Sequence, residues 1–462
     1  MGRCAPGAPV QVLAAALVLV ALAPGPAGGT RPSLLVTIGD VTATTAVVWA
    51  RLPAPGEVAV SLKPAAGEGG ARGTLEITRR ADFTGKLVLS GLTPATRYAW
   101  QARGGGETVT GQFVTAPAAD ARARVRFLWS GDLGGGGFCR PMDGGYRIFR
   151  TMALTRPDFF LFVGDTIYAD IKCDRPGVVP GADFVATRLD QYRARHRNQR
   201  EDPALQELVR ATSVDAIWDD HEVRNDFSGP TEPLMPTGRR AFLEYWPIVP
   251  PGDEPTRLYR KFRWGRLLEV FILDTRQYRS PNAAPDGPGK TMLGAAQRRW
   301  LVDSVSASTA TWKVVVSSVP LSIPTGSPAR RDSWSNASVY GTPQEGGTGF
   351  AVERDALLRQ FRERGVKNLV FVVADVHHAE IIRHHPAPGW SFHEFVAGPL
   401  SARFGRPRPL DEGLNPRSLF ARSGVNNFGE VTLEPAHLTV RLYDEEGAVL
   451  FTHTIKPDAR LD

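Results

Sequence analysis

Short runs in which apolar and polar residues alternate with a period of two occupy the first quarter of the chain. They are rich in β-branched residues, and turn-forming residues separate them, which is the pattern of a small β-sandwich. We therefore predict an all-β domain over residues 31–117. Its expected strands are 41–51, 58–62, 75–78, 86–89, 98–102 and 111–115.

A polar, alanine-rich linker at 117–124 precedes a different pattern, in which apolar runs of strand length alternate with segments of helical periodicity. This alternation predicts an α/β domain over residues 124–460. The expected strands are 125–130, 159–163, 213–218, 267–273, 312–316 and 369–373, and the expected helices are 145–155, 184–197, 203–211, 295–305 and 354–364. From residue 427 onward, further alternating runs predict strands that close one edge of this domain.

Residues 1–29 have the organisation of a secretory signal peptide. Arg3 supplies a basic start, residues 10–22 form an apolar stretch, and the small residues around Ala27 fit a cleavage site. The apolar stretch is short for a membrane span. We therefore expect a secreted or cell-envelope protein without a transmembrane segment after signal removal, and a retained anchor is the alternative.

Removal of this segment would leave two of the three cysteines, Cys139 and Cys173. In an exported protein this favours a disulfide bond. Each cysteine also lies close to an acidic motif, so a metal role for Cys139 stays open as the alternative. The sequon that starts at Asn336 predicts N-glycosylation in a host that modifies exported proteins.

Composition changes this picture little. The chain has 462 residues, of which 42% are apolar and 22% charged, as expected for a soluble protein of two domains. The net charge of +7 is spread along the chain, so it favours an anionic substrate only weakly. No dense basic run of the kind found in nucleic-acid-binding tails occurs, so we expect no stable nucleic-acid partner. We expect a monomer.

Acidic clusters follow directly after four of the predicted strands. They are Gly131-Asp132, Gly164-Asp165-Thr166-Ile167-Tyr168, Trp218-Asp219-Asp220-His221-Glu222 and Ala374-Asp375-Val376-His377-His378. Because the carboxyl ends of strands in α/β folds converge on one crevice, we expect these side chains to meet. Carboxylates gathered there would repel one another unless cations balanced them, so metal ions are the simplest explanation. Helix capping could explain Asp132 alone, but not Asp-Val-His-His after a buried run.

Taken in this order, the motifs Ser-Gly-Asp, Gly-Asp-Thr-Ile-Tyr, Trp-Asp-Asp-His-Glu-Val-Arg-Asn-Asp and Asp-Val-His resemble the alkaline phosphatase D (PhoD)-like family of calcineurin-like metallophosphoesterases. The resemblance covers most of the chain, since that family also carries an N-terminal β-domain. It implies a metallophosphoesterase β-sandwich flanked by helices, and hydrolysis of phosphomonoesters and phosphodiesters with iron and calcium. Within the N-terminal domain, residues 92–98 resemble the fibronectin type III pattern.

The resemblance also implies roles for individual residues. Asp165 corresponds to a carboxylate that bridges two metals, and His221 to a general acid that protonates the leaving oxygen. Arg224 and Asn225 are candidates for holding phosphate oxygens. Asp219 is expected to orient His221 or its loop. The implied metal ligands are Asp132, Asp165, Tyr168, Asp220, Asp375 and His377.

The first motif departs from the family pattern. Many members have a cysteine ligand just after the first strand, where this chain has Asp132, and Cys139 follows only later. We therefore assign Asp132 as the ligand, which leaves Fe³⁺ and Mn²⁺ open at this position. The second position is rich in oxygen ligands, which favours Ca²⁺. His378 and His393 are secondary site candidates, whereas His384 is expected on the surface.

The predicted chemistry is hydrolysis of phosphodiesters, phosphomonoesters or both by a metal-activated water. The substrates would be small molecules or phospholipids, and a phospholipase D-type reaction on lipid head groups is the alternative. Outside the enzyme class, the alternative is an inactive cell-surface binding protein. The sequence leaves open whether the glycine- and serine-rich segment 322–350 covers the pocket as a lid.

Overall fold

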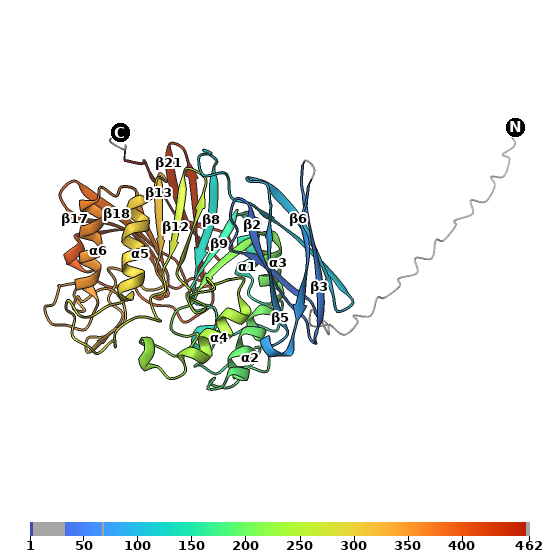
Figure 1. The fold of residues 1–462 in the computed structure, drawn as a ribbon, viewed down its shortest axis with the longest axis horizontal. Coiled ribbons are helices and arrows are strands. Elements are labelled where there is room, and N and C mark those ends of the chain that lie inside the picture. Colours follow the sequence, from blue (N-terminus) through green and yellow to red (C-terminus); the bar gives the residue numbers. More distant parts are fainter. Residues whose placement is uncertain (3–32, 67–68, 459–462) are drawn as a thin grey trace. The chain divides into compact units, whose positions relative to one another are not determined.

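The N-terminal β-sandwich is present as two sheets that enclose a shared apolar core. The computed structural model describes residues 1–2, 33–66 and 69–458, so residues 3–29 of the predicted signal peptide lie outside it. One sheet has the order β1 (Leu35–Gly39), β2 (Thr45–Arg51), β5 (Thr84–Ser90), and the other β4 (Arg72–Ile77), β3 (Gly56–Pro64), β6 (Arg97–Gly104), β7 (Glu107–Val114). Figure 1 shows these strands in blue. At the corner between the sheets the Tyr98 hydroxyl accepts a hydrogen bond from the Thr93 amide at 2.9 Å.

Strand β1 was not predicted, because it reads as a continuous apolar run rather than an alternating one. All five of its residues are buried. One face covers the sandwich core, and the other packs against the second domain, as its contacts with α3 (Pro203–Ala211) and β10 (Ser213–Ile217) indicate. On the neighbouring strand, the Trp49 indole donates a hydrogen bond to the Glu244 carbonyl at 2.8 Å, which ties this sheet to the second domain.

The second domain is built on two larger sheets. The six-stranded sheet has the order β10 (Ser213–Ile217), β9 (Phe159–Val163), β8 (Val125–Ser130), β20 (Asn427–Glu434), β21 (His437–Asp444), β22 (Val449–Ile455). Strands β8, β9 and β10 are parallel, and β20 runs antiparallel to β8. The last three strands therefore extend one edge of this sheet, as predicted from the pattern after residue 427.

The seven-stranded sheet faces the six-stranded one. Its order is β11 (Arg260–Trp264), β12 (Leu268–Ile272), β13 (Trp312–Val316), β16 (Leu369–Val373), β18 (Trp390–Val396), β17 (Ala379–Ala387), β19 (Pro416–Arg422). Aromatic contacts join the two sheets, for example Trp129 with Phe395 at 6.0 Å between ring centroids. The fold is thus the predicted α/β arrangement, with a metallophosphoesterase-like β-sandwich and an N-terminal β-domain.

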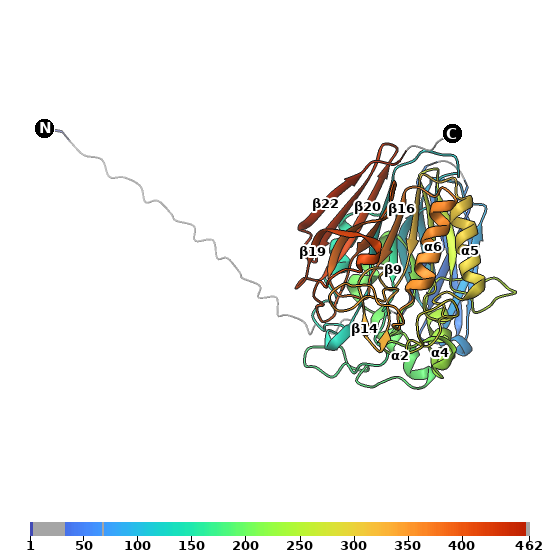
Figure 2. The same cartoon turned by 90° about the vertical axis from the view of Figure 1, so that its left-hand side faces the viewer.

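Helices cover the outside of this sandwich. Helices α5 (Gly294–Ala307) and α6 (Ala351–Glu363) lie side by side on the outer face of the seven-stranded sheet (Figures 1 and 2). Their apolar residues, among them Leu301 and Phe361, pack on Phe271 and Phe371 of that sheet. The remaining helices are α1 (Ile148–Leu154), α2 (Leu189–Arg200), α3 (Pro203–Ala211) and α4 (Met235–Tyr245). No helix of the described chain is long and apolar enough to cross a bilayer.

Two helices differ from their predictions for local reasons. Helix α2 begins at Leu189 rather than at 184, because the Gln191 side chain accepts backbone hydrogen bonds from Thr187 and Arg188 and so caps the helix there. Helix α4 was not predicted, since Pro236 and Gly238 break its pattern. The proline lies in the first turn, where its missing amide hydrogen has no helical partner.

The segment 322–350 is largely irregular. It contains a two-stranded hairpin, β14 (Gly326–Ser327) with β15 (Arg330–Arg331). Its residues 331–337 are buried, whereas Tyr340 is 79% exposed. Short 3₁₀ helices occur at Arg79–Ala81, Gly135–Gly137, Gly229–Thr231 and Glu412–Leu414.

Candidate metal centre

The predicted acidic motifs follow the carboxyl ends of four strands, three from one sheet and one from the other. Asp132, Asp165 and Asp375 come within two residues of the ends of β8, β9 and β16. All three have a positive φ, of 63°, 50° and 70°, which is uncommon for residues other than glycine. The chain thus leaves each strand in a sharp turn. Such conformations cost free energy and often mark functional sites.

The glycine of the Gly164-Asp165 pair is required by this geometry. Gly164 has a φ of 81°, and a Cβ atom added there would lie 2.6 Å from Cβ of Asp219. A larger residue would therefore separate the turn after β9 from the turn after β10. The Gly-Asp motif brings Asp165 close to the Asp219–Asp220 segment.

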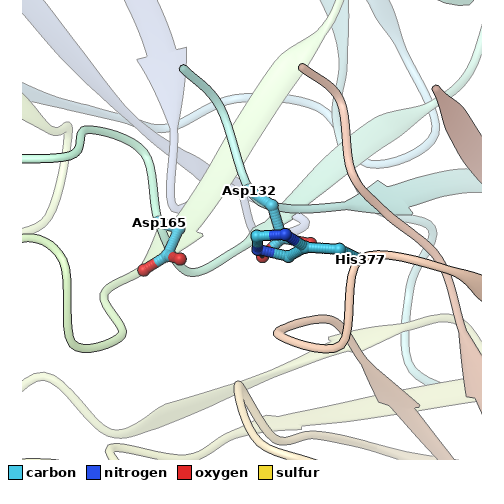
Figure 3. A group of neighbouring side chains, drawn as sticks. All are labelled: Asp132, Asp165 and His377. Carbon is cyan, nitrogen blue, oxygen red and sulfur yellow. Dashed lines mark ion pairs between the residues drawn. The ribbon is translucent and has the colours of Figure 1, made fainter. Parts of the chain in front are cut away.

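A first group of ligand atoms comes from Asp132, Asp165 and His377, all within 4.8 Å of one another (Figure 3). The Tyr168 hydroxyl lies 3.0 Å from Nε2 of His377. Nδ1 of His377 lies 2.6 Å from the Arg403 carbonyl, which can only accept, so Nδ1 carries the proton. Nε2 therefore has its lone pair available, as in histidines that bind metals.

A second group consists of Asp165, Asp220 and His221, again within 4.8 Å of one another. Asp165 belongs to both groups. Its two carboxylate oxygens suit it to bridge two cations, as the family resemblance implies. Asp375 is in neither group, but its amide donates to Oδ1 of Asp132 at 3.2 Å, which places it beside the first group.

Three carboxylates, those of the buried Asp132 and Asp165 and of the half-buried Asp375, form what we call the carboxylate cluster. Burial, reinforced by neighbouring aspartates, raises the pKa of each well above its usual value. Within the described chain, Oδ2 of Asp132 and Oδ2 of Asp375 have no hydrogen-bond partner. Buried carboxylate oxygens left in this way are suited to cations, and the oxygen-rich donor set with one imidazole fits hard or borderline metal ions.

His221 has a partner that the sequence did not reveal. Its Nδ1 lies 2.7 Å from Oδ1 of Asp170, and Oδ2 of Asp170 accepts a hydrogen bond from the Asn225 amide at 2.8 Å. Burial alone would lower the pKa of His221, but Asp220 and Asp170 raise it to about 9. The imidazole can therefore hold a proton at neutral pH. Only its closeness to Asp165 in the motif could have suggested Asp170.

Of the two alternatives expected for Asp219, orientation of the His221 side chain is wrong, since Asp170 has that position. The Asp219 carboxylate accepts hydrogen bonds from Arg276 Nε at 2.6 Å and from the Ser318 hydroxyl at 2.5 Å. Arg276 also makes two hydrogen bonds of 2.7 Å to Asp332. Arg279 Nη1 contacts Asp332 at 2.8 Å. We call Arg276, Arg279, Asp219 and Asp332 the arginine network.

The arginine network lies against the second group of ligands. Arg276 Nη2 is 3.7 Å from Oδ1 of Asp220. Burial alone would raise the pKa of Asp220, but Arg276 and His221 hold it below its usual range. Asp332 comes from the segment 322–350, so its bonds to Arg276 and Arg279 anchor this part of the segment beside Asp220. Asp220, Asp226 and Asp332 form a further acidic group, and Arg276 already supplies positive charge to it.

Several other predicted residues lie at the margin of the centre or outside it. The Arg224 side chain is 54% exposed and lies 3.8 Å from Glu232. Asn225 is exposed and contacts Asp170 through its backbone amide. His378 is buried and lies 3.0 Å from Glu380, so it is not directed at the ligands. His393 lines a separate cavity of about 280 Å³ with His453 and Arg383.

Three further expectations are settled by local contacts. Cys139 and Cys173 form a disulfide bond, so Cys139 is not a metal ligand. His384 is fully buried rather than exposed, and its Nε2 lies 2.9 Å from Glu394. Asn336 is only 5% exposed, and its amide nitrogen donates to the Gln344 carbonyl at 2.7 Å. The folded chain therefore does not present this sequon for glycosylation.

Comparison with known proteins identifies the family of this chain. A family model described as PhoD-like phosphatase matches residues 130–448, and one described as its N-terminal domain matches residues 26–117. Alkaline phosphatase D of Bacillus subtilis is 26% identical over 324 residues, which cover 63% of this chain and 52% of that protein, so the match spans about half of the relative's length.

Two solved structures share the fold. A structure of PhoD superimposes with a TM-score of 0.73 at 20% identity and covers 92% of both chains. The purple acid phosphatase PPD1 from yellow lupin seeds gives a TM-score of 0.63 at 13% identity, covering 92% of this chain and 75% of its own. These likenesses concern the fold, whereas the family model covers most of the sequence. The chain therefore belongs to the PhoD-like phosphatase family.

Proposed function

We propose that the protein is an exported metal-dependent phosphoesterase that hydrolyses phosphodiesters, phosphomonoesters or both. The observation that carries this proposal is the position of Asp165, which is shared by two groups of metal-ligand atoms. Carboxylate oxygens buried beside it without hydrogen-bond partners among the described residues support the same reading. A centre of this kind is suited to hold cations against a phosphoryl group.

In this proposal some residues bind the metal ions or the phosphate, and His221 transfers a proton. Bound metal ions would supply Lewis acidity towards the phosphoryl oxygens. His221, oriented by Asp170, would not bind a metal ion in this proposal but would hold a proton near neutral pH and donate it to the leaving oxygen. The exposed Arg224 side chain, at the margin of the site, would contact the remaining phosphate oxygens.

The donor set also suggests which ions would bind. Tyr168, Asp132 and His377 offer a phenol, a carboxylate and an imidazole, which suit Fe³⁺ or Mn²⁺. The second group, with Asp165 and Asp220, is dominated by oxygen and suits Ca²⁺. Mass spectrometry of the purified protein would test this assignment, and zinc as the sole bound metal would contradict it.

Export is proposed from residues 1–29 and from the disulfide bond. The Cys139–Cys173 bond is typical of proteins that fold in an oxidising compartment. Expression of the full chain in a secreting host, followed by N-terminal sequencing, tests this. A mature start near Ala27 in the medium or cell envelope is expected. An uncleaved chain in the cytoplasm would contradict export without affecting the proposed chemistry.

The decisive experiment measures hydrolysis of bis-p-nitrophenyl phosphate and p-nitrophenyl phosphate by protein of known metal content. Wild-type protein should cleave at least one of them, and His221→Ala should lower kcat by about 10²–10⁴-fold while metal content is retained. Inactive protein that still binds its metals would favour the binding-protein alternative. Preference for phosphatidylcholine over both test esters would favour the phospholipase D-type reaction.

A further inference from the structure

Two segments far apart in the sequence frame one side of the metal centre. The loop after β8, residues 133–138, packs on Tyr168, since a Cβ atom added at Gly135 would lie 2.4 Å from the Tyr168 ring. The segment 401–405 lies against it: the Ser401 amide donates to the Asp132 carbonyl at 3.1 Å, and Ser401 Oγ donates to the Phe138 carbonyl at 3.0 Å.

The same segment also holds a ligand candidate. Nδ1 of His377 donates to the Arg403 carbonyl at 2.6 Å, and the Gly405 amide donates to the His377 carbonyl at 2.9 Å. Phe404 stands between these two contacts. Residues 133–138 and 401–405 are therefore immediate neighbours of Asp132, Tyr168 and His377.

Each segment presents an aromatic ring to solvent. Phe138 and Phe404 are each 40% exposed, and their ring centroids are 6.4 Å apart with an angle of 41° between the ring planes. The guanidinium carbon of Arg175, itself exposed, lies 5.5 Å from the centroid of Phe138. We call Phe138, Phe404 and Arg175 the aromatic rim.

The aromatic rim is held in place covalently and by backbone hydrogen bonds. Cys139, next to Phe138, is joined by the disulfide bond to Cys173, two residues before Arg175. Two backbone hydrogen bonds of 2.8 and 2.9 Å connect the same loops, from Val179 to the Arg140 carbonyl and from Met142 to the Gly177 carbonyl. A surface ordered in this way loses less conformational entropy when it binds a ligand.

We propose that the aromatic rim binds the organic group of the phosphoester and favours esters with a planar apolar group, such as an aryl group or a nucleobase. This inference rests on the proposed phosphoesterase function, because an ester held at the metal centre would lie beside the two segments that carry these rings. Aromatic rings stack favourably with planar groups, and Arg175 adds positive charge beside an anionic ester.

The test compares the affinity of two non-hydrolysable ligands, phenylphosphonate and methylphosphonate, for the metal-loaded full chain by calorimetry. Both carry the same anionic group, but only one carries a ring. Wild-type protein should bind phenylphosphonate more tightly. Phe138→Ala and Phe404→Ala should each reduce that preference by roughly two- to tenfold, because each removes one aromatic contact.

Leu154→Ala provides the matched control. Leu154 is 82% exposed and is an apolar surface residue, as the rim phenylalanines are. It lies at the end of α1, before the start of β9, whereas the site lies after the end of β9. This variant should keep the wild-type preference. A Cys139→Ser, Cys173→Ser double variant with intact metal content should lose part of it, because the loops that carry Phe138 and Arg175 are no longer joined.

The outcomes separate the two proposals. Equal affinity for both ligands in wild-type protein, or an unchanged preference in both phenylalanine variants, would overturn the aromatic rim and leave the phosphoesterase proposal intact. Failure of wild-type protein to bind either phosphonate, together with no hydrolysis of the nitrophenyl esters, would overturn the phosphoesterase function and the rim with it.

Discussion

The carboxylate cluster and the arginine network are neighbouring sets of aspartates that differ in how their charge is balanced. Asp332 of the network accepts hydrogen bonds from two buried arginines, and these lower its pKa against the effect of burial. Asp132 and Asp375 of the cluster each keep an oxygen without a partner in the described chain, and burial raises their pKa. Side chains therefore balance the charge of Asp332, whereas Asp132 and Asp375 lack such a balance, as expected where metal ions bind. Asp219 is intermediate, because it is paired with Arg276 but keeps Oδ2 without a partner in the described chain.

The largest expected effect comes from removing the cation of the network. Arg276→Met should lower the free energy of unfolding by about 3–5 kcal/mol, because it leaves Asp219 and Asp332 buried without their main charge partner. Urea denaturation measures this. Arg188→Met, which removes a surface ion pair with Asp190, is the control and should change stability by less than about 1 kcal/mol.

Substitution of Asp170 tests whether the orientation of the His221 imidazole contributes to activity. Asp170→Asn should lower kcat by about 10–100-fold with little change in KM or metal content, because it weakens the hydrogen bond that holds the imidazole. Steady-state kinetics and metal analysis of the same sample measure this. Asp174→Asn, an exposed change on the following loop, should leave kcat unaltered, and an equal loss there would refute the role of Asp170.

His196 extends the comparison to a buried base that has no anionic partner among the residues that the structure describes. It stacks on Tyr245 at 5.1 Å, and burial together with Arg200 lowers its pKa to about 3. Since an unfolded histidine titrates near 6.5, the unfolded chain binds the proton first, and stability falls as the pH drops below that value. The loss should reach about 2 kcal/mol at pH 5. His196→Phe should reduce the dependence of the unfolding free energy on pH between pH 5 and 6.5. An unchanged dependence would mean that other groups cause the acid sensitivity.

The smallest expected effect is on the stability of the metal-free protein and comes from a substitution in the carboxylate cluster. Asp375→Asn should stabilise the metal-free protein by about 1 kcal/mol at pH 8, because it removes a charge that burial and other aspartates disfavour. Asp332→Asn should do the opposite, since its charge is paired with Arg276 and Arg279. Thermal unfolding of both variants after chelation measures this. Destabilisation by both substitutions would contradict the proposed difference in charge balance between Asp375 and Asp332.

The sequence by itself determined the strands and the residues that follow them. Strands β9, β13 and β16 and helix α3 have the bounds that the pattern predicted, because the three strands are apolar runs and the helix has a regular period between turn residues. The acidic motifs could be found for the same reason, since Asp132, Asp165 and Asp220 follow buried strands directly. Their order along the chain was enough to indicate the family.

Tertiary structure decided which of these side chains meet and what surrounds them. Asp170 rather than Asp219 contacts His221, and Arg276 and Asp332 meet beside Asp220 although 56 residues separate them. The aromatic rim joins Phe138 to Phe404 across an even longer stretch of chain. Local periodicity reports which face of an element is buried, but it carries no information on which distant segment packs there. Such contacts form only when the two sheets and their loops come together.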